Sequence, residues 1–132
     1  MNYQFSQRSF TNMAGVRPEL IEIALQAIQM SPIDFGIPSS GGLRTAEEQK
    51  ALFVNGKSKC DGEVKKSYHQ SGNALDFYAY VDGAASWKEE HLAIVAAAFL
   101  QAAIELGYTL EWGGLWKGFR DMPHVQMPED DG

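Results

Sequence analysis

The stretch SYHQSGNALDFYAYV, residues 67–81, contains the pattern that predicts a sheet and two residues that could carry chemistry. Apolar and more polar residues alternate over residues 74–81, which predicts a β-strand. Because strand side chains point alternately to opposite faces, Asp76 lies on the polar face, opposite a core face made of Leu75, Phe77, Ala79 and Val81. A bend at Gly72 would bring the His69 imidazole back over the Asp76 carboxylate.

Three helices are predicted outside this stretch. The first begins at Arg17-Pro18 and ends before Ser31-Pro32, and the second runs from a capping box at Thr45 and Glu48 to Val54. The third and longest runs from a second capping box, at Ser86 and Glu89, to a cap at Gly107.

Short strands are expected at residues 34–38, 108–112 and 124–127, and residues 1–16 are interpreted as an irregular arm. Helices followed by mostly local strands indicate the α+β class. The sequence therefore predicts a single domain over residues 1–132, with a small antiparallel sheet packed against about three helices.

The composition of the chain limits the classes of function that can be expected. The chain has 132 residues, 45% of them hydrophobic and 21% charged, which is typical of one globular domain. The net charge is −6 and no Lys/Arg cluster exceeds the pair Lys65-Lys66, so we do not expect nucleic-acid binding. No apolar run reaches the roughly 18 residues that a membrane span requires, and stable membrane binding is not expected. The single cysteine, Cys60, excludes an intramolecular disulfide.

The chain has three histidines, His69, His91 and His124. His91 lies within the long helix and is interpreted as a surface or packing residue. Pro123 removes a ladder donor, so Asp121 is expected at the end of a loop and His124 at the start of a strand. Two imidazoles and one carboxylate could give Zn²⁺ three ligands and leave one position for water, with Asp121 as a general base. Spacing alone favours the alternative, in which these are two ordinary loop histidines and surface aspartates.

Several motifs resemble those of a known family. They are Ser67-x-His69-x-x-Gly72-x-Ala74-x-Asp76, Glu111-Trp112-Gly113-Gly114, and Asp121-x-Pro123-His124-x-Gln126. This set resembles the zinc peptidases of bacterial cell-wall peptides, which include D-alanyl-D-alanine carboxypeptidases, dipeptidases and the L-alanyl-D-glutamate peptidases used as phage endolysins. The resemblance extends in order to Ser6-Gln7-Arg8-Ser9, Gly15-Val16-Arg17-Pro18, Gly42-Leu43-Arg44-Thr45 and Glu48-Gln49, and so covers nearly the whole chain.

The resemblance implies a role for each matching residue. It places the Zn²⁺ ligands on His69, Asp76 and His124, in a cleft on the sheet. It places the catalytic carboxylate on Asp121, where many relatives have glutamate. Arg44 is expected to stabilise the oxyanion, because a guanidinium stays charged at any working pH; without the resemblance it would be a solvated residue beside a helix cap. Further expectations are substrate binding or loop orientation by Ser67, and a position in the cleft or the core for Trp112 and Trp116.

The implied activity is hydrolysis of an amide in the stem peptide of peptidoglycan, at the L-Ala–D-Glu bond, by a phage endolysin. The alternatives are a D-alanyl-D-alanine carboxypeptidase and a non-catalytic zinc-containing binding domain. The N-terminal residues lack the layout of a secretory signal. We therefore expect synthesis in the host cytoplasm and action in the periplasm after a separate holin-type partner permeabilises the membrane, with a monomer as the default state.

Overall fold

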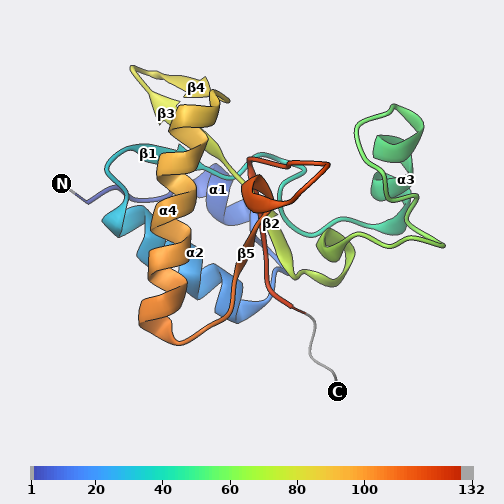
Figure 1. Cartoon of the computed structure of the whole chain (residues 1–132), viewed down its shortest axis with the longest axis horizontal. Helices are drawn as coiled ribbons and strands as arrows, with labels where there is room; N and C mark the ends of the chain where they lie inside the picture. Colours follow the sequence, from blue (N-terminus) through green and yellow to red (C-terminus); the bar gives the residue numbers. More distant parts are fainter. Residues whose placement is uncertain (1, 129–132) are drawn as a thin grey trace.

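The computed structural model describes residues 2–128 and confirms the α+β class (Figure 1). The helices are α1 (Gln7–Asn12), α2 (Pro18–Met30), α3 (Ala46–Val54) and α4 (Glu89–Leu106), with 3₁₀ turns η1 (Tyr68–Ser71) and η2 (Gly113–Leu115). The strands are β1 (Asp34–Gly36), β2 (Ala74–Asp76), β3 (Tyr78–Val81), β4 (Ala84–Ser86), β5 (Glu111–Trp112) and β6 (His124–Gln126).

The strands form two antiparallel sheets of three strands each, in the orders β1-β3-β4 and β2-β6-β5. The single strand predicted over residues 74–81 is wrong, because the chain leaves one sheet and enters the other at Phe77. The Phe77 amide donates to the Pro123 carbonyl at 2.8 Å, and its buried ring stacks on Phe99 with centroids 5.2 Å apart. The predicted alternation still holds, since Leu75, Phe77 and Ala79 are all fully buried.

The core lies between the long helices and the two sheets. Helices α2 and α4 pack side by side (Figure 1). Their buried faces meet a core of aliphatic and aromatic side chains that includes Leu20, Ile23, Val95, Phe99 and Val125. Burial of such side chains provides most of the stabilisation of a domain of this size.

Local signals placed most helix ends correctly. Pro18 opens α2, the Thr45 hydroxyl and the Glu48 carboxylate form the predicted capping box of α3, and Gly107 ends α4 in the left-handed conformation at φ 81°. These signals act within one helical turn, so they work independently of the rest of the fold.

Two predictions near helix starts are wrong. Residues 7–12 of the expected irregular arm form α1, whose N-cap is Ser6. A helix this short is not stable in isolation. Tertiary contacts support it, among them a 3.1 Å hydrogen bond that the Ser9 hydroxyl accepts from the Ile37 amide. The second capping box is also absent, because Ser86 belongs to β4 and α4 begins after Lys88, which makes no side-chain cap. Strands β3 and β4 form a hairpin around Asp82-Gly83, both at positive φ, as a tight two-residue turn requires.

Helix α3 stands at the edge of the molecule, away from α2 and α4 (Figure 1). The loop that follows α3 leads through η1 into β2, and this path forms one side of the cleft described below. Within residues 2–128, no helix is long and apolar enough to cross a membrane.

Candidate metal centre

Three elements bring His69, Asp76 and His124 together. Asp76 ends β2 and His124 begins β6, and the two residues are paired directly across the antiparallel ladder. His69 lies on η1, which ends at Gly72 with φ 76°. A Cβ at Gly72 would lie 2.9 Å from the Gly15 carbonyl oxygen, so both the conformation and the close approach require glycine. The bend expected at this glycine is therefore present.

The three side chains present a compact donor set. Asp76 Oδ1 lies 3.2 Å from His69 Nε2 and 3.0 Å from His124 Nδ1, and one donor atom from each residue lies within 4.8 Å of the others. Donor atoms around tetrahedral zinc are separated by ~3.3 Å, as follows from Zn–N bonds of about 2.0–2.1 Å. The residues therefore fit a tetrahedral metal ion with three protein ligands.

Hydrogen bonds on the far side of each imidazole select the nitrogen that faces the centre. His69 Nδ1 donates to the Gly42 carbonyl at 2.9 Å, leaving Nε2 toward Asp76. Gln126 donates its amide to Glu111 at 3.3 Å, so its oxygen faces His124 Nε2 at 2.8 Å and accepts from it. His124 Nδ1 is then the nitrogen available to a metal. Such outer hydrogen bonds orient the ligands of known metal sites.

Arg44 holds the second oxygen of Asp76. Its Nη2 lies 3.0 Å from Asp76 Oδ2, while Nη1 donates to Gln49 Oε1 and Nε to the Ser40 carbonyl. The arginine is 9% exposed, so this bond lies in an environment of reduced screening. The contacts support a role for Arg44 in positioning the candidate ligand Asp76.

The charges of the centre are strongly coupled. Burial alone would raise the pKa of Asp76, but the charges of His69 and His124 and their hydrogen bonds outweigh it and hold the pKa well below its usual range. Burial alone would lower the pKa of His124, but its hydrogen bond to Asp76 and the charge of that carboxylate raise it. A metal ion would take the place of the proton that His124 shares with Asp76.

Asp121 lies beside this group without joining it. Its Oδ2 is 3.9 Å from His124 Nδ1, and its side chain is 34% exposed toward the cleft. Burial raises the pKa of its carboxyl, and the nearby charge of Asp76 raises it further. Its backbone amide donates to the Gly113 carbonyl at 2.9 Å, and a Cβ at Gly113 would clash with the Asp121 carbonyl oxygen. The glycine therefore allows this loop to approach the centre.

The centre lies in a cleft of about 680 Å³. Ser67 lines it and caps η1, its hydroxyl accepting from the His69 amide at 3.2 Å. The Trp116 ring also lines it, 5.3 Å from the His124 ring, whereas Trp112 packs against the core and donates to the Met122 carbonyl. His91 lies apart on α4 and pairs with the Ser86 hydroxyl at 2.7 Å.

Three features of the site were not predicted from the sequence. Gln126 orients His124 and the fully buried Gln49 holds Arg44, although both residues stand inside the quoted motifs. Several lysines also line the cleft. Four of the seven lysines fall within residues 57–66. Such a cluster of positive charge in an acidic chain is the sequence signal from which a binding role for this loop could have been predicted.

Two imidazoles and a carboxylate thus converge in an open cleft, with a second carboxylate beside them. This arrangement defines the site as a candidate metallohydrolase centre. A model of the family "Phage L-alanyl-D-glutamate peptidase" matches residues 1–127. The chain belongs to this family.

Individual relatives agree with this assignment. The L-alanyl-D-glutamate peptidase of Escherichia phage T5 is 36% identical over 122 residues, which cover 92% of this chain and 87% of that protein. The peptidoglycan L-alanyl-D-glutamate endopeptidase CwlK of Bacillus subtilis is 34% identical over an alignment 102 residues long, and the match covers 65% of this chain and 57% of CwlK. The crystal structure of the Serratia marcescens L-Ala D-Glu endopeptidase ChiX matches with a TM-score of 0.84 and 34% identity, covering 96% of this chain and 91% of ChiX.

Proposed function

We propose that this protein hydrolyses the amide between L-alanine and D-glutamate in the stem peptide of peptidoglycan, using Zn²⁺ held by His69, Asp76 and His124. The observation that carries the proposal is the convergence of these three donors within 4.8 Å, beside Asp121 in the cleft. Bound zinc would act as a Lewis acid and would lower the pKa of water toward 7. Family membership and the names of the relatives support the choice of bond.

Asp121 is the proposed general base. Its carboxylate is near the donor set but is not one of its three members, so it is available to accept the proton of the attacking water. The same carboxyl then donates that proton to the amine of D-glutamate as the amide bond breaks. Burial raises the pKa of this carboxyl in the metal-free site, and a carboxyl group beside the attacking water can both take a proton and return it.

Arg44 has two proposed roles. Its bond to Asp76 Oδ2 keeps the other oxygen directed at the two imidazoles. Its permanent positive charge, at the wall of the cleft, would also stabilise negative charge that develops on the scissile carbonyl oxygen. Ser67 is proposed to bind substrate, because it lines the cleft next to the same centre.

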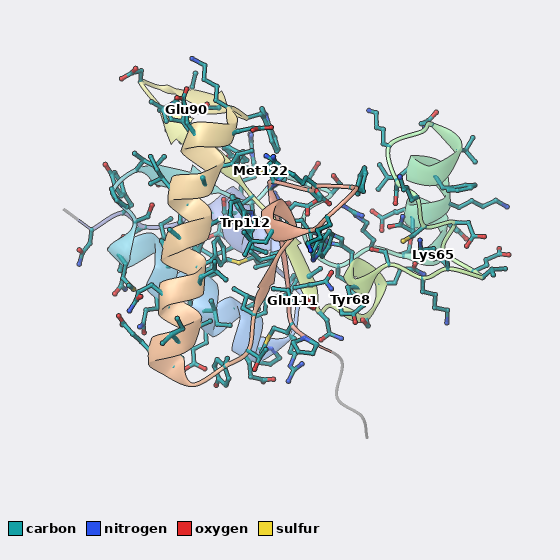
Figure 2. The ribbon with its side chains drawn as sticks, viewed as in Figure 1. Lys65, Tyr68, Glu90, Glu111, Trp112 and Met122 are labelled. Carbon is teal, nitrogen blue, oxygen red and sulfur yellow. The ribbon has the colours of Figure 1, made fainter. Side chains whose placement is uncertain are left out.

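Asp121→Asn tests the base directly. We expect the variant to retain zinc, measured by elemental analysis, and to lose turnover by at least about 100-fold, the lower end of what a general base contributes. Glu90→Gln, which neutralises an exposed carboxylate at the start of α4, is the matched control and should keep full activity (Figure 2). Full activity of Asp121→Asn would refute the assignment.

Mass spectrometry of digested muropeptides tests the bond. Cleavage between L-alanine and D-glutamate leaves a fragment with D-glutamate at its new N-terminus, whereas the carboxypeptidase alternative releases free D-alanine. Absence of any product from purified sacculi, with zinc bound, would instead favour a non-catalytic binding domain.

We further propose that the protein is a monomer that is synthesised in the host cytoplasm during phage infection. A separate holin-type partner would open the membrane, and the protein would then act on the cell wall in the periplasm. Membership in a family of phage peptidases supports this setting. Added from outside, the purified protein should lyse chemically permeabilised Gram-negative cells and leave intact cells unharmed. Lysis of intact cells at the same rate would contradict the need for a partner.

A further inference from the structure

Basic side chains are concentrated in the cleft of this acidic protein. Within residues 2–128, six of the eleven Lys and Arg residues line it, against two of the fourteen Asp and Glu residues of that range, while the net charge of the whole chain is −6. Besides Arg44, the basic residues are five lysines, here named the lysine rim: Lys57, Lys59, Lys65, Lys66 and Lys117. A cleft lined by one sign of charge raises the local concentration of ligands of the opposite sign.

The lysine rim is not explained by ion pairs within the fold. In the part of the chain that the structure describes, no ion pair within 4.0 Å involves any of the five lysines. Asp61, an acidic residue of the same loop, instead accepts from the backbone amides of residues 63, 64 and 65 at 2.9–3.0 Å. The ammonium groups are thus available to a ligand.

The lysine rim comes from two loops that meet across the cleft. Four members precede η1, and Lys117 follows η2. Lys59 Nζ lies 4.6 Å from the centre of the Phe119 ring, so the first loop contacts the second directly. In Figure 2, Lys65 and Tyr68 lie on the α3 side of the molecule, whereas Trp112 and Met122 lie nearer α4. The positive charge therefore lines the cleft that contains the donor set.

The chemistry of D-glutamate provides a matching anion, and this step rests on the proposed function. Glutamate has two carboxyl groups, and its nitrogen belongs to the bond that is cut. A stem peptide continues through one carboxyl only, so the other remains free on the same residue whose nitrogen is in the scissile bond. We propose that the lysine rim binds this free carboxylate and makes the enzyme selective for stem peptides in which it is ionised rather than converted to a carboxamide.

The test compares two synthetic stem peptides that differ only in this group, carboxylate or carboxamide. Wild-type protein should cleave the carboxylate peptide with a kcat/KM at least about tenfold higher, the effect of one or two charge-assisted hydrogen bonds. The preference should shrink between 0.1 and 1 M salt, because the Debye length falls from about 10 Å to about 3 Å.

A double variant, Lys65→Gln with Lys66→Gln, should lose activity on the carboxylate peptide and keep its activity on the carboxamide. The control, Lys50→Gln with Lys88→Gln, removes the same charge from exposed positions outside the cleft and should keep the full preference. All four substitutions are at exposed side chains, so equal thermal midpoints are expected and exclude misfolding as the cause.

Three results would count against these inferences. Equal cleavage of the two peptides by wild type overturns selectivity for the carboxylate. An equal loss on both peptides in the Lys65/Lys66 variant overturns recognition by the lysine rim. Cleavage of neither peptide between L-alanine and D-glutamate refutes the proposed function itself, which separates that failure from the first two.

Discussion

Replacing Gln126 with methionine should weaken zinc binding through His124. Methionine has nearly the same length, but its sulfur is a much weaker acceptor than the Gln126 oxygen, which lies 2.8 Å from His124 Nε2. The imidazole is 6% exposed, so water can replace the lost acceptor only in part. The ring would then be free to rotate or to change tautomer, and either change removes Nδ1 from the donor set.

Two separate arguments give the expected loss of zinc affinity in Gln126→Met. A buried donor left without a partner costs about 1–3 kcal/mol. Loss of an outer hydrogen bond to a metal-binding histidine lowers metal affinity by about 10–100-fold, which corresponds to about 1.4–2.8 kcal/mol. We therefore expect the dissociation constant for Zn²⁺ to rise by about 10–100-fold.

Competition against a coloured zinc chelator measures this constant in the wild type, in Gln126→Met and in a control, Gln101→Met. Gln101 is an exposed residue of α4 that hydrogen-bonds Glu105 and lies outside the cleft. If Gln126→Met and the control bind zinc equally well while both remain folded, the orienting role of Gln126 is refuted.

Two further predictions concern stability. Gln49→Leu removes the fully buried amide that accepts from Arg44 and donates to Ser58 and Cys60. Denaturant unfolding should show a loss of about 2–4 kcal/mol, because each stranded polar group costs about 1–3 kcal/mol; a loss no greater than that of Gln101→Leu would contradict this. Hydrogen bonds from backbone amides, led by that of Lys65, lower the pKa of Asp61. The ionised carboxylate therefore contributes its full stabilisation of the fold above the ordinary pKa of about 3.9. This contribution is lost as the pH falls through the lowered pKa of the folded state. NMR titration should show the amides of residues 63–65 shifting with this carboxyl, and Asp61→Ala should abolish the shift; an unperturbed titration would contradict the assignment.

The sequence predicted features whose causes lie within a few residues. Pro18, the Thr45–Glu48 pair and Gly107 mark helix ends because each acts on the first or last turn of its own helix. The alternation around Leu75 and Phe77 identified the core face for the same kind of local reason. Gly72 was expected to turn the chain, and it does so at positive φ.

Other local signals were present but were outweighed or overlooked. Ser86 and Glu89 match a capping box in sequence, yet pairing of Ser86 with Ala79 places Ser86 in a strand. Asp82-Gly83 is a strong hairpin signal, but no hairpin was predicted after the strand expected to end at residue 81. In the first case the ladder overrode local helix propensity, which is weak by comparison with tertiary packing.

By itself, the sequence determined the α+β class, the core faces, most helix ends and the identity of three residues that the fold brings together. Only the tertiary structure decided that the chain changes sheets at Phe77, that Arg44 holds Asp76, and that five lysines gather around one cleft. The physical reason is the separation along the chain between the residues that interact. A cap or an alternating face depends on neighbours along the chain, whereas these contacts join residues dozens of positions apart, and neither partner carries a local mark of the other.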